Sequence, residues 1–385
     1  MDAIPFNRPR LVGSEHRYID EALASGKLSG NGTFARRCAA WIQDRFDVSA
    51  AMITPSCTSA LEMTCVVAEL RPGDEVIVPD FTFVSTANAF ALRGVVPVFV
   101  DIDPDTLNID PDAIEGAITE RTRAIVVVHY GGVACDMDRI MAVAERHGLI
   151  VIEDAAHAIE ATYRGRPLGS FGAMATLSFH ETKNVQCGEG GALLLKDPGL
   201  VERAEIVQEK GTNRSRFFRG EIDKYTWLDI GSSYLLSEVA TAFLWAQLEA
   251  VDEITRERRG IWQRYYDALA PLEEQGVLRR PIVPAGSEHG GHLFHVLVGA
   301  ASERDPVIAE LRARGVHAVF HYLPLHASPG GRRFGRLAGS ASVTEDASAR
   351  LIRLPLWSGM GEARVERVIE AVYDSVGVRA PLRAA

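Results

Sequence analysis

The chain has 385 residues, a net charge of -10 and 47% hydrophobic residues. This length predicts more than one domain, and the acidity argues against binding nucleic acid or an anionic membrane through bulk charge. A small anionic ligand is compatible with this charge because helix N-termini and single basic residues bind such groups locally.

Cysteine usage and the N-terminus indicate the compartment. The cysteines contain no CxxC pair, so neither a zinc site nor a disulfide framework is predicted. Residues 1–15 lack the basic and apolar pattern of a secretory signal, and no apolar stretch is long enough to span a bilayer. These features predict a soluble protein of the reducing cytoplasm, without a membrane partner or a metal. The five cysteines are Cys38, Cys57, Cys65, Cys135 and Cys187.

Short apolar runs in the first half of the chain predict buried strands. They are continuously apolar rather than alternating, as expected when both faces of a sheet are covered. Amphipathic segments at 59–70 and 136–148 lie between them, which predicts right-handed βαβ units and a mostly parallel sheet. The predicted strands are 50–55, 74–79, 96–103, 124–130, 149–156, 175–179 and 191–196.

The second half changes character near residue 236. A long amphipathic helical segment, 236–269, is predicted to leave the first domain and enter a second. We therefore predict a large α/β domain at 1–250 and a small α+β domain at 251–385. The latter should contain a strand at 292–299 and helices at 305–315 and 362–376. The spacing of His292 and His295 in this strand lacks a zinc pattern, so they are not predicted to bind zinc. We expect them to face solvent or a polar edge.

Small polar residues follow the first predicted strand. Ser56, Cys57, Thr58 and Ser59 open a helix, where backbone N–H groups and hydroxyls can surround a phosphate. Taken alone, such residues before a helix are more often only an ordinary N-cap.

Two further groups follow later strands. Asp154 ends the strand 149–156, and a carboxylate there needs a cation or strong donors. A protonated pyridine nitrogen would suit it, and a salt bridge or helix cap is the alternative.

Lys183 lies five residues after Ser178, between small residues and a glycine-rich turn, where a lysine can act as a nucleophile. Taken alone, such a lysine is more often exposed.

The order of these groups along one parallel sheet is more informative than each group. Ligands bind at the carboxyl ends of parallel strands. Phosphate contacts, a carboxylate for a ring nitrogen and a lysine for an aldehyde are what pyridoxal 5'-phosphate (PLP) requires. Lys183 is therefore predicted to form a Schiff base with PLP.

The sequence also resembles, nearly from end to end, the DegT/DnrJ/EryC1/StrS family of sugar aminotransferases. The resemblance implies the aspartate aminotransferase fold, which is PLP-dependent transferase fold type I. Residues 209–238 are most similar to the branch of dTDP-4-amino-4,6-dideoxygalactose transaminases, which act on dTDP-4-keto-6-deoxyglucose. The motifs that carry the resemblance are GKLSGNG (26–32), TPSCTSALEM (54–63), EDAAHA (153–158), SFHETKN (178–184) and FHYLPLH (320–326).

This resemblance implies roles for individual residues. Lys183 and Asp154 are the predicted catalytic residues: Lys183 would carry the cofactor and move the proton, and Asp154 would pair with the pyridinium nitrogen. His157 would lie near the phenolic oxygen of the cofactor, and Phe83 would stack on its ring. The phosphate would be held by Cys57, Thr58 and Ser178.

Ser233 departs from the family pattern. Many relatives have an asparagine there that reaches the phosphate of the neighbouring subunit, so the shorter serine implies a weaker or water-mediated contact. This site across two subunits makes a homodimer the smallest expected assembly. For the substrate, the resemblance implies contacts from Lys27, Tyr322 and His326. Whether Arg216, Arg219 and Lys224 bind a diphosphate or line a dimer contact is left open.

The implied reaction transfers an amino group from L-glutamate to C4 of dTDP-4-keto-6-deoxyglucose, with pyridoxamine phosphate (PMP) as the intermediate form of the cofactor. The product would be a dTDP-4-amino-4,6-dideoxyhexose, galacto or gluco. A PLP-dependent sugar dehydratase is disfavoured because such members carry a histidine in place of the lysine. A non-catalytic regulatory protein would not need Asp154, Ser178 and Lys183 together. A different nucleotide enzyme is disfavoured by the lack of GxGxxG and P-loop motifs.

Overall fold

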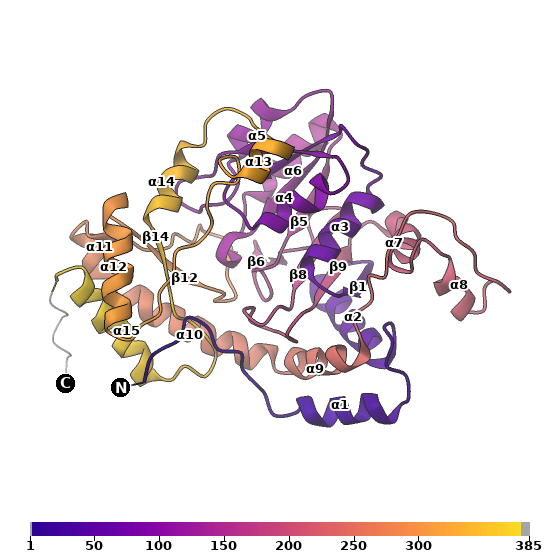
Figure 1. The fold of residues 1–385 in the computed structure, drawn as a ribbon, viewed down its shortest axis with the longest axis horizontal. Coiled ribbons are helices and arrows are strands. Elements are labelled where there is room, and N and C mark those ends of the chain that lie inside the picture. The colour runs from indigo at the N-terminus through magenta and orange to yellow at the C-terminus, as the bar shows by residue number, and fades with distance from the viewer. Residues whose placement is uncertain (1, 379–385) are drawn as a thin grey trace.

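The computed structural model describes residues 2–378 and has an eight-stranded sheet at its centre (Figure 1). The strand order is β1-β9-β8-β5-β4-β2-β3-β13. Only β9 runs antiparallel to its neighbours, so the prediction of a mostly parallel sheet is confirmed. The strands are β1 (Ala50–Thr54), β2 (Glu75–Pro79), β3 (Val96–Val100), β4 (Thr122–Val128), β5 (Ile150–Asp154), β8 (Met174–Ser178), β9 (Gly191–Leu195) and β13 (Arg336–Leu337).

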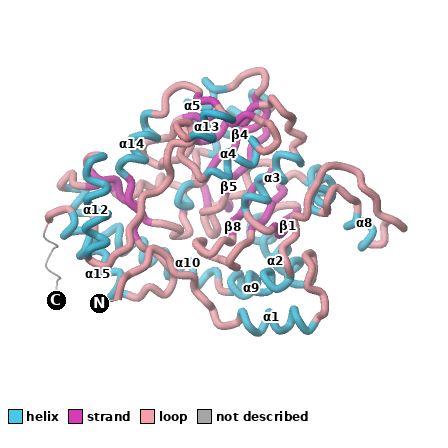
Figure 2. The backbone as a smooth tube through the Cα atoms, viewed as in Figure 1, coloured by secondary structure: helices cyan, strands magenta, loops and turns pink. Residues whose placement is uncertain are grey.

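Both faces of this sheet are covered by helices, as Figure 2 shows. Successive side chains of a strand point to opposite faces, so a continuously apolar strand feeds two cores. Ile77 of β2 belongs to the core shared with α2, α5, α6 and α9. Its neighbours Val76 and Val78 belong to the core shared with α3, α4 and α7.

The helices surround the sheet and extend into the C-terminal part. None of those within residues 2–378 is long and apolar enough to cross a membrane. They are α1 (Glu15–Ala24), α2 (Thr33–Phe46), α3 (Cys57–Val67), α4 (Val84–Ala91), α5 (Pro111–Ala117), α6 (Met137–His147), α7 (Val201–Gln208), α8 (Arg214–Phe218), α9 (Glu238–Glu249), α10 (Val251–Ala268), α11 (Ala270–Glu274), α12 (Ala301–Ala313), α13 (Pro329–Phe334), α14 (Ser342–Arg350) and α15 (Glu362–Ser375).

The predicted long helical segment is divided at Ala250 into α9 and α10. The division has a packing reason. Leu244 and Leu248 of α9 are buried in the core of the large sheet. Trp262 and Tyr265 of α10 are buried in a separate core in the C-terminal part. Because two different cores take up the apolar residues of the segment, α10 begins a new helix after Ala250.

The C-terminal part has its own three-stranded sheet, in the order β10-β12-β14. We retain 1–250 and 251–385 as a proposed division, of which 379–385 lie outside the described residues. Two segments cross it: Ile4 is buried in the C-terminal core, and β13 pairs with β3 of the large sheet. The smaller strands are β10 (Leu278–Arg279), β12 (Phe294–Val298), β14 (Leu351–Leu354), and, in a third sheet, β11 (Ser287–Glu288), β6 (Thr162–Tyr163) and β7 (Arg166–Pro167).

Glu238, the first residue of α9, caps the start of α2. Its carboxylate is buried and accepts hydrogen bonds from the backbone N–H groups of Gly32, Phe34 and Ala35 at 2.8–3.1 Å. These are N–H groups that a helix N-terminus leaves without an intrahelical partner. A negative charge there is also favoured by the helix dipole.

We expect Glu238→Ala to destabilise the fold by about 3 kcal/mol, because it leaves buried N–H groups without an acceptor. Thermal unfolding of the variant and the parent protein, followed by circular dichroism, measures this. Glu274→Ala, at an exposed position of α11, is the matched control and should unfold like the parent. Equal unfolding temperatures for the two variants would contradict the capping role.

Candidate active site

A cavity of about 780 Å³ opens between the carboxyl edge of the large sheet and the C-terminal part. Parallel α/β sheets bind ligands at this edge. Residues of both parts line the cavity, from Phe6 near the N-terminus to Leu356 after β14. Eight residues predicted from the sequence are among them: Cys57, Thr58, Phe83, Asp154, His157, Ser178, Lys183 and Tyr322.

The start of α3 forms one wall of the cavity. The Ser56 side chain caps the helix by accepting from the N–H of Ser59, at 3.0 Å. The N–H groups of Cys57 and Thr58 have no intrahelical acceptor at these positions, so they are available to an anion. Gly191 of β9 lets the strand approach, because a Cβ there would lie 2.4 Å from the Cys57 nitrogen. The N-cap is therefore present, and the same turn offers the donors that the predicted phosphate site needs.

Asp154 lies at the end of β5 and is only 5% exposed. Its carboxylate accepts hydrogen bonds from the Thr86 hydroxyl at 2.8 Å and from the Ala156 N–H at 3.2 Å. Within residues 2–378 it forms no ion pair, although a carboxylate has about four acceptor sites. Burial raises the pKa of Asp154, which a cationic partner would reverse. A protonated ring nitrogen fits this position.

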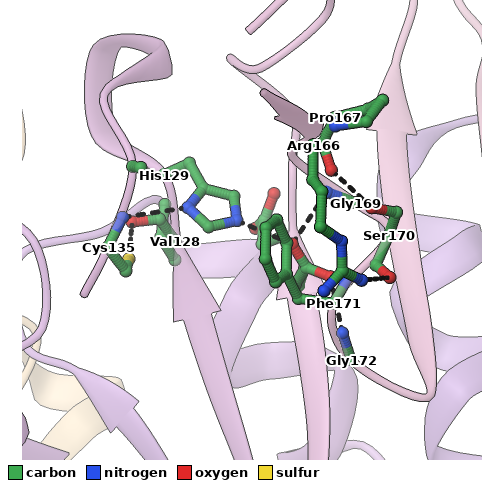
Figure 3. A network of polar contacts seen from close by, with 12 residues as sticks. Val128, His129, Cys135, Arg166, Pro167, Gly169, Ser170, Phe171 and Gly172 are labelled. Carbon is green, nitrogen blue, oxygen red and sulfur yellow. Dashed lines mark hydrogen bonds and ion pairs between the residues drawn. The ribbon is translucent and has the colours of Figure 1, made fainter. Parts of the chain in front are cut away.

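Glu153, the preceding residue, is fully buried, and because side chains alternate along a strand it points to the face opposite Asp154. Figure 3 shows the residues that surround it, among them His129, Gly169 and Phe171. It accepts hydrogen bonds from the N–H groups of Gly169, Phe171 and Gly172, each at 2.7 Å. His129 Nδ1 accepts from the backbone N–H of Cys135, so the ring hydrogen must be on Nε2, which donates to Glu153 at 3.0 Å. This saturated network fixes the end of β5 and with it the position of Asp154.

Lys183 follows β8 in the loop that the sequence predicted, and its side chain lines the cavity. Its backbone N–H donates to the His180 carbonyl at 2.9 Å, while its amine makes no hydrogen bond within residues 2–378. Burial lowers the pKa of the amine to about 8. At pH 7 about a tenth of Lys183 is therefore neutral, and so nucleophilic, whereas an ordinary lysine has less than about a thousandth in this form.

His157 forms part of a stack of rings on the wall of the cavity. Its Nδ1 accepts from the Gly131 N–H at 3.3 Å, so the ring hydrogen is on Nε2, which lies 3.4 Å from the Tyr322 hydroxyl. The His292 ring stacks on it, with centroids 4.2 Å apart. His292 Nδ1 lies 2.9 Å from the Asn184 amide oxygen, next to Lys183. Burial lowers the pKa of both histidines, which keeps them neutral.

The expectation that His292 and His295 face solvent or a polar edge is wrong. Both are buried, with exposed fractions of 8% and 7%. His292 precedes β12 and lines the cavity, and His295 packs against the ring of Tyr130. The spacing of these histidines gives no sign of their burial, because it arises where the C-terminal sheet packs over the large domain.

Three predicted site residues lie outside this cavity. The Lys27 amine is exposed and donates to the Asn31 carbonyl at 3.2 Å. His326 donates through Nδ1 to the buried carboxylate of Asp80, at 2.6 Å. Ser233 is exposed and forms a backbone bridge with Glu209. Their predicted roles remain proposals. Of the basic residues left open, Arg216 and Arg219 pair with glutamates of their own chain.

Sequence reasoning missed several residues that the cavity requires. Thr86 supports Asp154, and it lies one turn after Phe83 at the start of α4. Arg258 and Arg353 also line the cavity. A signal for Arg353 was present, because an arginine inside the apolar run LIRLPLW interrupts a buried strand and must find a polar partner.

The described residues fit PLP. Asp154 has acceptor capacity for a protonated ring nitrogen, the start of α3 has free donors for a phosphate, and Lys183 has a nucleophilic amine. The sheet and its cavity define the class: a PLP-dependent enzyme of fold type I. The chain belongs to the DegT/DnrJ/EryC1/StrS aminotransferase family, whose model matches residues 9–373.

Similar proteins agree with this assignment. The chain is 34% identical, over 97% of both sequences, to the spore coat polysaccharide biosynthesis protein SpsC of Bacillus subtilis (strain 168). The aminotransferase TlmJ from Streptoalloteichus hindustanus is 32% identical, with a TM-score of 0.89 over 97% of this chain and 98% of that one. Spr1654 from Streptococcus pneumoniae has been solved in a PMP form, to which this chain is 26% identical, and in a PLP form, at 25%. Each match covers 97% of this chain and 98% of that one, with a TM-score of 0.89. The predictions of an aminotransferase, its fold and PLP are thus confirmed at the level of the family.

We expect the Lys183 amine of the cofactor-free protein to titrate near pH 8, as its lowered pKa requires. Ordinary lysines titrate near 10.4, so its neutral fraction should rise through a range where they stay charged. Reductive ¹³C-methylation followed by NMR titration should show a resonance with this midpoint in addition to that of the N-terminal amine, which titrates in the same range. That resonance should disappear in Lys183→Ala. If the resonance that disappears in Lys183→Ala instead titrates above pH 9.5, the pKa of Lys183 is not lowered and the prediction is wrong.

Proposed function

We propose that the protein transfers the amino group of L-glutamate to C4 of dTDP-4-keto-6-deoxyglucose, giving a dTDP-4-amino-4,6-dideoxyhexose. The observation that carries aminotransfer is that Asp154 and Lys183 line the same cavity. Asp154 is a buried carboxylate that forms no ion pair within residues 2–378, and Lys183 has an amine with a lowered pKa. The sugar nucleotide is supported by the resemblance of residues 209–238 to one branch of the family, and L-glutamate as the donor by the resemblance to the family as a whole.

The residues divide the work of holding the cofactor. PLP, when bound, supplies an aldehyde that accepts the amino group and a ring that delocalises charge from the substrate carbon. The N–H groups at the start of α3, with Thr58 and Ser178, would hold its phosphate. Phe83, which is 56% exposed at the cavity wall, would cover its ring. The Nε2–H of His157 would donate to its phenolic oxygen.

Lys183 has two tasks in the proposed reaction. Its neutral amine would hold the cofactor through the aldehyde before the donor arrives. Once released by the donor, the same amine would take the proton from the substrate α-carbon and pass it on to the cofactor. A pKa of about 8 suits both tasks, since the group is then close to half protonated at a mildly basic pH.

Asp154 keeps a negative charge beside the ring nitrogen. The Thr86 hydroxyl donates to Asp154, so it must accept from the Thr82 hydroxyl, which lies 2.9 Å away. This chain of hydroxyls orients the carboxylate without neutralising it. An oriented charge in a buried site stabilises the developing cation at little reorganisation cost.

We propose a homodimer as the working assembly, with Ser233 facing the neighbouring cofactor site. The arm formed by residues 211–233 projects from the large domain in Figure 1 and exposes large apolar side chains. Phe218 is 64% exposed and Trp227 is 78% exposed. Apolar groups in this number on one segment are typical of a contact surface. The five unpaired cysteines support a reducing, cytoplasmic location.

Lys183→Ala should abolish turnover, by at least about 1000-fold, because it removes the only proposed base for the proton transfer. The visible absorption of the PLP-loaded parent should fade with L-glutamate and return with dTDP-4-keto-6-deoxyglucose. Lys196→Ala, at a lysine that pairs with Asp47, is the control and should behave like the parent. Substantial transaminase activity in Lys183→Ala would refute the role of this lysine. NMR of the sugar product assigns its configuration at C4.

Asp154→Asn keeps the shape of the side chain and removes its charge. We expect kcat to fall by about 100- to 1000-fold, the usual cost of losing one oriented electrostatic contact. Thr86→Val, which removes one hydrogen bond to Asp154, should cost about tenfold. Single-turnover kinetics with L-glutamate measure both. A larger loss in Thr86→Val than in Asp154→Asn would show that the charge is not the essential feature.

A further inference from the structure

Two buried polar side chains, those of Asn184 and His292, lie beside the reacting groups and have no task in the proposed reaction. Asn184 follows Lys183 directly in the chain, and His292 lines the cavity just before β12. Both residues are buried. Burying polar groups is costly unless they are hydrogen-bonded, so the contacts of this pair show what it is built for.

The Asn184 amide determines which ring nitrogen of His292 carries the hydrogen. Its Nδ2 donates to the Gly290 carbonyl at 2.8 Å, and its oxygen lies 2.9 Å from His292 Nδ1. Because an amide oxygen only accepts, Nδ1 must carry the hydrogen. Burial lowers the pKa of His292 and keeps the ring neutral, so its Nε2 carries no hydrogen. This tautomer is the opposite of that of His157, whose hydrogen is on Nε2.

The backbone of His292 is fixed from both parts of the chain. Arg258 of α10 donates through Nε to the Gly291 carbonyl at 3.0 Å and through Nη2 to the His292 carbonyl at 2.6 Å. A Cβ at Gly290 would lie 2.2 Å from the Ile159 carbonyl oxygen, so the large domain packs closely against this segment. With its backbone and its Nδ1 both held, the His292 ring has little freedom to move.

The His292 ring in turn supports the His157 ring. The two rings are nearly parallel, with 23° between their planes and 4.2 Å between their centroids. The polar contacts of His157 itself are long, 3.3 Å to the Gly131 N–H and 3.4 Å to the Tyr322 hydroxyl. Such long contacts orient a ring poorly. The stacked neighbour therefore contributes most to fixing the plane of His157.

We propose that Asn184 and His292 are positioning residues of the reaction. Asn184 sets the tautomer and the plane of His292, and His292 sets the plane of His157 by stacking. The Nε2–H of His157 is thereby kept in the direction of the phenolic oxygen of the cofactor. This inference rests on the proposed function, in which His157 donates to that oxygen.

The same contacts link this support to the reacting amine. Asn184 is the neighbour of Lys183 in the chain, so one hydrogen-bonded and stacked set of residues places both the amine and the His157 donor. Misplacing a reacting group by about 1 Å can cost about 100-fold in rate. Loss of the set should therefore slow the reaction with L-glutamate and leave the affinity for L-glutamate nearly unchanged.

Two substitutions of His292 separate the stack from the hydrogen bond. His292→Ala removes both, whereas His292→Phe keeps a flat ring and removes only the hydrogen bond. Single-turnover fading of the visible band gives the maximal rate and the apparent Kd of L-glutamate separately. The rate should fall by about 30- to 100-fold in His292→Ala and by about fivefold in His292→Phe, with each Kd changed less than about twofold. His317→Ala, at an exposed histidine of the C-terminal part, is the control and should match the parent.

Three outcomes of this experiment overturn the proposal. One is an unchanged rate in His292→Ala, and another is an equal loss of rate in His292→Ala and His292→Phe, which would exclude the stack. The third is a change in Kd alone, which would make His292 a substrate contact. If His292→Ala does not fold, Asn184→Ala replaces it, because it frees the His292 ring without removing it. The rate of Asn184→Ala should fall about fivefold, and an unchanged rate would overturn the proposal.

Histidine NMR of the cofactor-free protein tests the first link without catalysis. Two-bond ¹H–¹⁵N spectra distinguish a neutral ring with its hydrogen on Nδ1 from one with its hydrogen on Nε2. A ring of the Nδ1–H type should be present in the parent and in His317→Ala and absent from His292→Phe. In Asn184→Ala the same ring should lose the Nδ1–H pattern. An Nε2–H pattern for His292 in the parent would overturn the proposal.

Failure of the proposed function looks different from failure of this inference. In the first case the PLP-loaded parent keeps its visible band with every amino acid, while the cofactor-free protein still shows the Nδ1–H ring of His292. In the second case the band of the parent fades with L-glutamate, and His292→Ala fades at the same rate.

Discussion

The cavity depends on two adjacent carboxylates at the end of β5. Because side chains alternate along a strand, Glu153 and Asp154 point to opposite faces of the sheet. Glu153 receives three backbone N–H groups and His129, which satisfies it completely. Asp154 receives two donors, and among the described residues it forms no ion pair. One carboxylate therefore fixes the strand, and the other keeps the acceptor capacity that a cationic ligand needs.

The cavity is also a product of contacts between the two parts of the chain. Asp101, just after β3, accepts hydrogen bonds from the N–H groups of Val343 and Thr344 at the start of α14. Asp80, just after β2, accepts from the backbone and the ring of His326. These two carboxylates, of which Asp80 is fully buried, hold the C-terminal part over the carboxyl edge of the sheet. The rings and the arginines on that side consequently face Asp154 and Lys183.

Much of the large domain could be predicted because its signals are local. Continuously apolar runs identified all the parallel strands except the two-residue β13, and the residues after β1, β5 and β8 were placed at one edge. Thr86 could not be found in this way, because its bond to Asp154 joins residues 68 apart. His292 was misjudged for a similar reason, since its burial comes from packing between the two parts of the chain.

The sequence by itself determined the family, the sheet and the residues fit for PLP chemistry, since strand periodicity and short motifs depend on neighbouring residues. Only the tertiary structure decided which charged groups are satisfied. Arg258 and Arg353 look alike in the sequence, yet Arg258 donates to three backbone carbonyls, whereas the Nε of Arg353 has no acceptor within residues 2–378. That difference arises from distant segments meeting in space, and hydrogen-bond satisfaction in a buried site depends on those meetings.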